Sequence, residues 1–116
     1  MDLEQLQSYC LSKKHATEDY PFGEGTLAFR VKEKIFALTS VTGNPESVNL
    51  KCNPELAVDL RERYDDVKPG YHMNKKHWNT VVITGKIPDK EIENMIDHSY
   101  DLIFKSLSQK IRKELV

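Results

Sequence analysis

Residues 71–80 bring together side chains that could recognise a ligand. The segment contains two histidines, two lysines, two asparagines and the single tryptophan of the chain. Lysine ammonium groups can contact phosphates, amides and imidazoles can pair with polar base edges, and an indole ring can stack on a base. This combination is typical of a nucleic-acid recognition surface. The residues that we predict to form it are His72, Asn74, Lys75, Lys76, His77 and Trp78.

Other interpretations of the same segment stay open. It could be a polar turn between two strands in which Trp78 belongs to the core, because tryptophan is highly buried on average. A metal could bind His72 and His77, but stable sites commonly have three or four ligands, so we predict no metal site. A histidine acting as a general base would need a nucleophile, and the nearby candidates, Tyr71 and Thr80, are weak.

Composition narrows the class of protein. The chain has 116 residues, 39% of them hydrophobic and 30% charged, with a mean hydropathy of −0.58. These values predict one soluble globular domain over residues 1–116. No stretch approaches the ~18 apolar residues of a membrane span, and the acidic N-terminal segment lacks the features of a secretory signal, so we expect a cytoplasmic protein.

Motifs that bind nucleotides, metals or cofactors are absent from the sequence. No glycine-rich phosphate loop, Cys-x-x-Cys pair or nucleophile elbow occurs. We therefore predict no catalytic residue and no cofactor, and leave enzymatic activity open. Cys10 and Cys52 lie within apolar patterns, which indicates buried free thiols rather than nucleophiles.

The distribution of charge bears on which partners are possible. A net charge of −1 excludes a general polycation, so any binding of a polyanion must depend on a local cluster. Basic residues are in excess in the segments predicted as strands, and acidic residues are in excess in the predicted helices. Lysines that solvate strands and protect sheet edges would give the same pattern. The strand residues that would extend a positive surface are Arg30, Lys32, Lys34 and Lys51.

Hydrophobic periodicity predicts an α+β domain with the element order α-β-β-β-α-β-β-α. Asn53 followed by Pro54 is a strong helix start, since asparagine caps well and proline suits the first helical position. Short turns between strands imply an antiparallel five-stranded sheet in a two-layer fold with helices on one face. The expected helices are 2–13, 54–64 and 88–113, the expected strands are 27–31, 35–41, 48–52, 67–73 and 78–84, and 14–26 is expected to be a loop.

These segments resemble the MmcQ/YjbR family of small bacterial proteins over nearly the whole chain. The most specific block of the family, His-Met-Asn-Lys-Lys-His-Trp-Asn-Thr-Val, is present intact from His72 to Val81. The other segments that carry the resemblance are Tyr9-Cys10, residues 48–56, residues 66–69 and Pro88-Asp89.

The resemblance implies a two-layer α-β(3)-α-β(2)-α fold, similar to secretion chaperones and to CyaY/frataxin-like proteins. It also implies DNA binding through a double-wing arrangement of hairpins. We accordingly expect weak, salt-sensitive DNA binding in which Lys75 and Lys76 contact phosphates and Trp78 packs under the turn or stacks. Two alternatives remain: a protein- or peptide-binding module of chaperone-like architecture, and a small-ligand or enzymatic pocket built on His72, His77, Asn74 and Tyr71. We expect no membrane partner, and favour a monomer.

Overall fold

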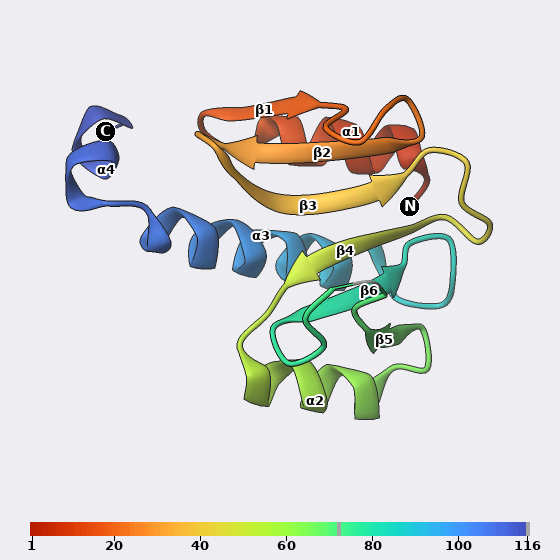
Figure 1. The fold of residues 1–116 in the computed structure, drawn as a ribbon. Helices are drawn as coiled ribbons and strands as arrows, with labels where there is room; N and C mark the ends of the chain where they lie inside the picture. Colours follow the sequence, from red (N-terminus) through yellow and green to blue (C-terminus); the bar gives the residue numbers. More distant parts are fainter. Residues whose placement is uncertain (72, 116) are drawn as a thin grey trace.

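A six-stranded antiparallel sheet forms one layer of the fold, and helices pack against one of its faces (Figure 1). The computed structural model describes residues 1–71 and 73–115. The strands lie in the order β1-β2-β3-β4-β6-β5, so β4 and β6 are central neighbours although a helix and β5 separate them in the sequence. The strands are β1 (Ala16–Asp19), β2 (Thr26–Val31), β3 (Lys34–Ser40), β4 (Ser47–Lys51), β5 (Val67–Pro69) and β6 (Trp78–Val82).

Local capping interactions set the starts of the first two helices. The carboxylate of Asp2 accepts a hydrogen bond from the backbone N–H of Gln5 at 2.8 Å, and the Gln5 side chain accepts one from the Asp2 N–H. The Asn53 side chain accepts one from the N–H of Glu55 at 3.0 Å, as its sequence position predicts. The helices are α1 (Leu3–Ser12), α2 (Pro54–Arg63), α3 (Asp89–Ser106) and α4 (Gln109–Leu115).

The strand register aligns the core in one row across the sheet. Because successive side chains of a strand point to opposite faces, residues paired across strands share a face. One row runs over β2, β3, β4, β6 and β5, and each of its side chains is buried under the helices. Helix α3 covers this row with the apolar stripe that its sequence predicts, including Ile92, Ile96 and Ile103. The row consists of Leu27, Thr39, Val48, Val81 and Val67.

The neighbouring row points to the opposite face, which we call the open face. It crosses all six strands in continuous register, from the β1 edge to the β5 edge. Helices α1 and α3 pass behind the sheet in Figure 1, and α2 lies below β5 and β6, so the open face is turned toward the viewer. The row consists of Asp19, Ala28, Leu38, Asn49, Thr80 and Lys68.

The expectations of five strands and of a loop over 14–26 are both wrong, because the sheet has a sixth strand within 14–26. Residues 16–19 form β1, which pairs with β2 along its whole length. Three of its four side chains are exposed, so the segment shows no apolar alternation that could reveal it. Backbone pairing with β2 is what makes it a strand. The segment 67–73, expected to be extended, is a strand only over 67–69.

The last helix is interrupted where one continuous helix was expected. Leu107 is extended, with φ −68° and ψ 151°, and ends α3. Ser108 then opens α4, since its side-chain oxygen accepts a hydrogen bond from the N–H of Ile111 at 3.2 Å. The apolar stripe continues through both helices, so its periodicity conceals the break.

Among helices built from residues 1–71 and 73–115, none combines the length and the apolar character needed to cross a bilayer.

Candidate functional site

The loop between β5 and β6 is held in shape by two of the predicted site residues. The side-chain oxygen of Asn74 accepts hydrogen bonds from the backbone N–H groups of Lys76 at 2.9 Å and His77 at 3.3 Å. Lys75 Nζ donates to the carbonyl oxygen of Gly70 at 2.9 Å, across the base of the loop. Asn74 and Lys75 therefore stabilise the loop itself.

Helix α2 fixes the same loop from the other side of the sheet. Arg61 Nε donates to the side-chain oxygen of Asn79 at 2.7 Å, and Arg61 Nη2 donates to the carbonyl oxygens of Lys75 and Trp78. The Asn79 side chain is buried under α2, where it also donates to the carbonyl oxygen of Ala57 at 3.4 Å. The start of β6 is thus positioned by one guanidinium group.

Trp78 points to the open face, because its neighbour Asn79 points to α2. Its partner across the β4–β6 pair is Lys51, and the Trp78 side chain is half-buried. Strand β3 begins, and β4 and β5 end, at the same end of the sheet where β6 begins. The fold therefore brings Trp78 and Lys51, which are distant in the sequence, into one surface.

The predicted cations differ in whether their side chains already form ion pairs or hydrogen bonds within the fold. Arg30 Nε lies 2.8 Å from the carboxylate of Asp19, and Arg30 Nη1 donates to the carbonyl oxygen of Glu33. Lys34 Nζ donates to the carbonyl oxygen of Ser106 at 3.1 Å, which ties the β2–β3 turn to the end of α3. Within the described part of the chain, three predicted cations form no side-chain hydrogen bond or ion pair: Lys32, Lys51 and Lys76.

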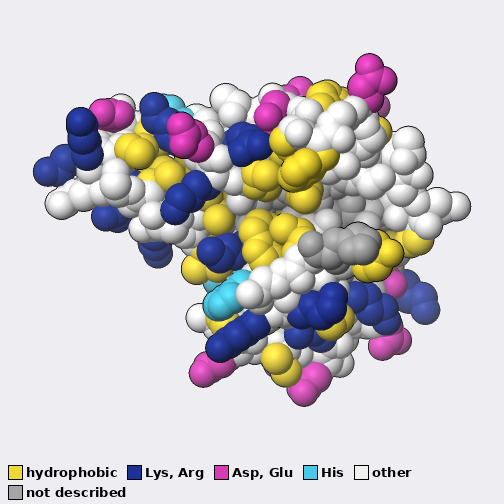
Figure 2. Space-filling view, viewed as in Figure 1, with side chains coloured by type: hydrophobic (Ala, Val, Ile, Leu, Met, Phe, Trp, Pro, Cys, Tyr) yellow, Lys and Arg dark blue, Asp and Glu magenta, His cyan; other side chains and the backbone are white. Residues whose placement is uncertain are grey.

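The structure adds Lys68 to this surface. Lys68 pairs with Thr80 in register on the open face, its side chain is exposed, and Thr80 donates a hydrogen bond to Asn49 Oδ1 at 2.5 Å. The signal in the sequence was its position after the buried Val67 in an extended segment. Figure 2 shows hydrophobic side chains in the middle of this face, with lysine and arginine side chains gathered around β6, β5 and α2.

The metal and small-ligand interpretations of the 71–80 segment can be compared with the structure only in part. His72 lies outside the described residues. Among residues 1–71 and 73–115, no three His, Cys, Asp or Glu side chains gather closely enough to hold a metal ion. The pocket that the described residues form between α2 and α3 is lined by side chains other than Tyr71, Asn74 and His77.

Both thiols are buried and free. Burial raises the pKa of the Cys10 thiol to about 12, against a smaller opposing effect of Lys13. Burial likewise raises the pKa of the Cys52 thiol to about 11, against an opposing effect of Arg61. Thiols of this kind are poor nucleophiles at neutral pH, because the reactive thiolate is scarce.

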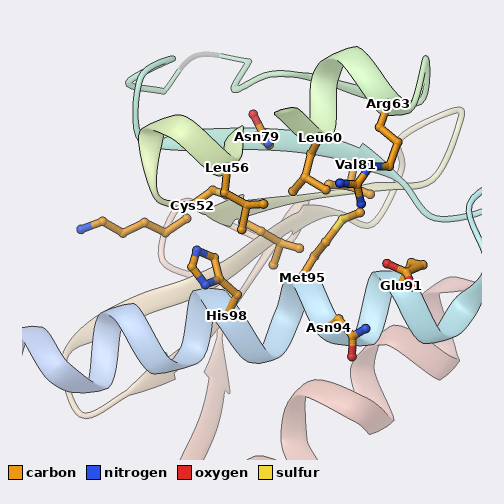
Figure 3. A pocket seen from close by; sticks show the side chains of 12 residues that line it. Cys52, Leu56, Leu60, Arg63, Asn79, Val81, Glu91, Asn94, Met95 and His98 are labelled. Atoms are coloured by element: carbon orange, nitrogen blue, oxygen red, sulfur yellow. The ribbon is translucent and has the colours of Figure 1, made fainter. Parts of the chain in front are cut away.

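No motif in the sequence indicates a second site between α2 and α3. A pocket of about 150 Å³ opens there, on the helix-covered side of the sheet (Figure 3). The hydrophobic periodicity of the sequence places its apolar lining residues in the core or in helix stripes. Periodicity identifies which side chains point inward, but not where the packed elements leave a space.

Comparisons with sequences of known proteins show one family. The YjbR family matches residues 11–102 of the chain. The protein YjbR of Escherichia coli K12 is 35% identical over 116 residues, covering all of this chain and 98% of its own length. The Bacillus subtilis protein YyaQ is 42% identical over 60 residues, half of each chain. Both relatives are described as uncharacterized.

Solved structures show the same fold. The crystal structure of a Deinococcus radiodurans protein superposes with a TM-score of 0.91 at 37% identity, covering 97% of this chain and 86% of the other. The crystal structure of a Pseudomonas syringae protein gives a TM-score of 0.79 at 31% identity, covering 89% and 99%. The α+β class and the two-layer arrangement expected from the sequence are confirmed, with six strands in place of five.

Proposed function

This chain belongs to the YjbR family, and we propose that it is a DNA-binding protein that holds the polyanion on the open face of its sheet. One observation carries the proposal: on the adjacent strands β4, β6 and β5, Lys51 stands opposite Trp78 and Lys68 stands opposite Thr80. Two ammonium groups that pair with nothing among residues 1–71 and 73–115 thereby flank a partly accessible aromatic ring and a polar pair.

The chemistry of this arrangement suits a single strand of DNA. Successive phosphates can contact Lys51 and Lys68 while a base stacks on the indole of Trp78, and such stacking contributes about 1–3 kcal/mol per base. Helices that enter a duplex groove would need to project from the contact face, whereas α1, α2 and α3 all cover the other face (Figure 1). A flat sheet with an aromatic side chain is instead a surface on which unpaired bases stack.

The charge of the surroundings limits the affinity. Toward β1 the open face carries Asp19, which is already paired with Arg30, and the net charge of the chain is −1. The lysines that flank Trp78 and Thr80 therefore lie on the β4–β6–β5 half of the sheet, and Lys32 stands apart from them at the β2–β3 turn. Few phosphates can be neutralised there, so binding is weak and falls as salt rises.

A fluorescence anisotropy titration with a labelled single-stranded oligonucleotide, repeated over a series of salt concentrations, tests the proposal. We expect Lys51→Ala and Lys68→Ala each to weaken binding and to lower the slope of log affinity against log salt by about 0.7. The matched control is Lys90→Ala, an exposed lysine on the helix side. Absence of binding at low salt to both single-stranded and duplex DNA would overturn the proposal.

A second candidate function is binding of a protein or peptide on the same face. It is favoured by two half-buried apolar side chains of β3 on that face, Ile35 and Leu38, which are separated from Trp78 by β4. Leu38→Ala would strongly weaken the binding of a protein partner, because protein–protein contacts depend on buried apolar anchors. The same substitution would alter the affinity for DNA far less than Lys68→Ala does, so the two variants together separate the candidates.

A further inference from the structure

The pocket between α2 and α3 is separate from the open face. Leu50 and Val81 form its floor, and both belong to the side of the sheet that the helices cover. The backbone of β4 and β6 therefore lies between this pocket and the surface that carries Trp78. Lys51 is shared by the two sites, since it lines the rim of the pocket and also stands opposite Trp78.

The walls of the pocket are apolar, and they come from α2, from α3 and from the segment that joins β4 to α2. Figure 3 shows Leu56 and Leu60 projecting from α2 and Met95 projecting from α3, with Cys52 beside them. Most of these side chains are shielded from solvent in the fold, and Met95 is only 7% exposed. Expelling water from such a surface favours an apolar occupant.

The polar groups of the pocket lie along the α3 wall and at the mouth. Figure 3 shows His98, Asn94 and Glu91 on α3, and Arg63 reaching over from α2. Arg63 is already paired with Asp59 at 2.7 Å. Since charges of both signs stand at the mouth, the lining selects no net charge in a ligand.

His98 supplies a directed hydrogen bond in this wall. Its Nε2 accepts a hydrogen bond from the backbone N–H of Asn53 at 3.1 Å, which leaves the proton of the neutral ring on Nδ1. Burial lowers the pKa of His98, opposed by the nearby charge of Asp101 and reinforced by that of Lys105. Because Nε2 accepts the hydrogen bond from Asn53, the ring is neutral, and its Nδ1–H forms no hydrogen bond with the part of the chain that the structure describes.

The size of the pocket restricts the class of ligand. Its volume is about 150 Å³, and an apolar cavity of about that volume in another protein is known to take up benzene. Nucleotides and common cofactors need pockets of roughly 300 Å³ or more. From this volume and lining we propose that the pocket between α2 and α3 binds a small, uncharged molecule about the size of one aromatic ring that bears a single hydrogen-bond acceptor.

Acetophenone, an aromatic ring with one carbonyl acceptor, is a suitable probe, and toluene is the same ring without the acceptor. Titrated into the ¹⁵N-labelled protein, acetophenone should give saturable amide shifts centred on residues that line the pocket, and toluene should bind at least about threefold more weakly. Shifts that fail to saturate up to the solubility limit of acetophenone would overturn the proposal. Equal affinity for toluene would overturn the assigned acceptor.

A filling substitution with a matched control locates the binding. Leu56→Phe places extra volume in the pocket, whereas Val58→Phe places it on the exposed side of the same helix, where Val58 is 50% exposed. We expect Leu56→Phe to weaken acetophenone binding at least about tenfold and Val58→Phe to change it less than about twofold. Undiminished binding by Leu56→Phe would contradict the assignment.

The two thiols give a second readout that needs no filling variant. Cys52 lines the pocket, whereas Cys10 is buried on α1 and does not. Acetophenone should slow alkylation of Cys52 relative to that of Cys10 in the native protein. Equal slowing of both thiols would reflect general stabilisation of the fold and would count against occupation of this pocket.

Discussion

The hydroxyl of Ser99 on α3 donates a hydrogen bond to the carbonyl oxygen of Phe36 on β3 at 2.6 Å. The hydroxyl oxygen of Ser99 in turn accepts a hydrogen bond from the backbone N–H of Lys51 on β4 at 2.9 Å. The β3–β4 ladder stops at the pair Ala37–Leu50, so the hydroxyl bridges the two backbone groups that follow it. A helix side chain thus continues the ladder at the end of the sheet where Lys51 and Trp78 stand.

Ser99→Ala should therefore destabilise the fold. It would leave a buried carbonyl and an N–H group without partners, at a cost of about 2 kcal/mol. Urea unfolding followed by circular dichroism measures the change. Ser8→Ala, at an exposed position on α1, should stay within about 0.5 kcal/mol of the parent protein. Equal effects of the two substitutions would contradict the bridging role.

Removal of the Arg61 guanidinium should release the β5–β6 loop from α2. Arg61→Ala leaves the buried side chain of Asn79 without its donor at 2.7 Å, and we expect a loss of about 2 kcal/mol in the free energy of unfolding. Arg63→Ala is the control, since Arg63 forms an exposed pair with Asp59 that should contribute about 0.5 kcal/mol or less. Amide hydrogen exchange should show faster exchange at residues 74–79 in the first variant alone.

A methyl group at Gly70 should strain the β5–β6 pair. A Cβ atom there would lie 2.9 Å from the Cβ of Trp78 and 3.0 Å from its carbonyl oxygen, so Gly70→Ala should cost about 1–3 kcal/mol. Gly25→Ala is the matched control, because a Cβ at Gly25 meets nothing within 4 Å. Thermal unfolding should show a lower Tm for the first variant and an unchanged or slightly raised Tm for the second.

The contact between α1 and α3 should make stability depend on acid. Asp97 accepts hydrogen bonds from the hydroxyl of Tyr9 at 2.6 Å and from Lys13 Nζ at 2.8 Å. Burial alone would raise the pKa of the Asp97 carboxyl, but the hydrogen bonds from Lys13 and Tyr9 and the charge of Lys13 outweigh burial and lower it.

Since the folded-state pKa lies below the unfolded value of roughly 3.9, the contact stabilises the fold above about pH 4. The stabilisation is lost as pH falls through the folded-state pKa. Because the Asp97 side chain is 36% exposed, we expect Asp97→Asn to cost no more than about 1 kcal/mol at pH 7. Urea unfolding at pH 7 and pH 3 should show the difference from the parent shrinking in acid. A difference independent of pH would contradict the assignment, and Asp101→Asn is the control on the same helix.

The sequence predicts most elements of this fold, because apolar and polar residues alternate along the strands and capping residues mark the helix starts. Val48 and Leu50 alternate with polar residues, and Asn53 caps α2 as its type suggests. Strand β1 escaped prediction because it is stabilised by pairing with β2 rather than by burial of its own side chains. The break at Leu107 could not be predicted, because Ser108 starts α4 in phase with the apolar stripe of α3.

The candidate site could be predicted by residue type but not by arrangement. The density of polar and aromatic groups in 71–80 drew attention to Trp78, but only the strand order places Lys51 and Lys68 beside it. Sequence alone also does not show which cations form ion pairs within the fold, as Arg30 does with Asp19. These facts depend on register, which long-range pairing sets.

The outline of the sheet has a consequence for how the protein behaves at high concentration. Its two edge strands are too short to pair well with a strand from another molecule. Strand β5 spans three residues and ends in Pro69, which has no N–H, and β1 spans four residues and ends in Glu18 and Asp19. A net charge of −1 gives the molecules little colloidal repulsion. Protection against cross-β growth therefore rests on the shape and chemistry of these two edges.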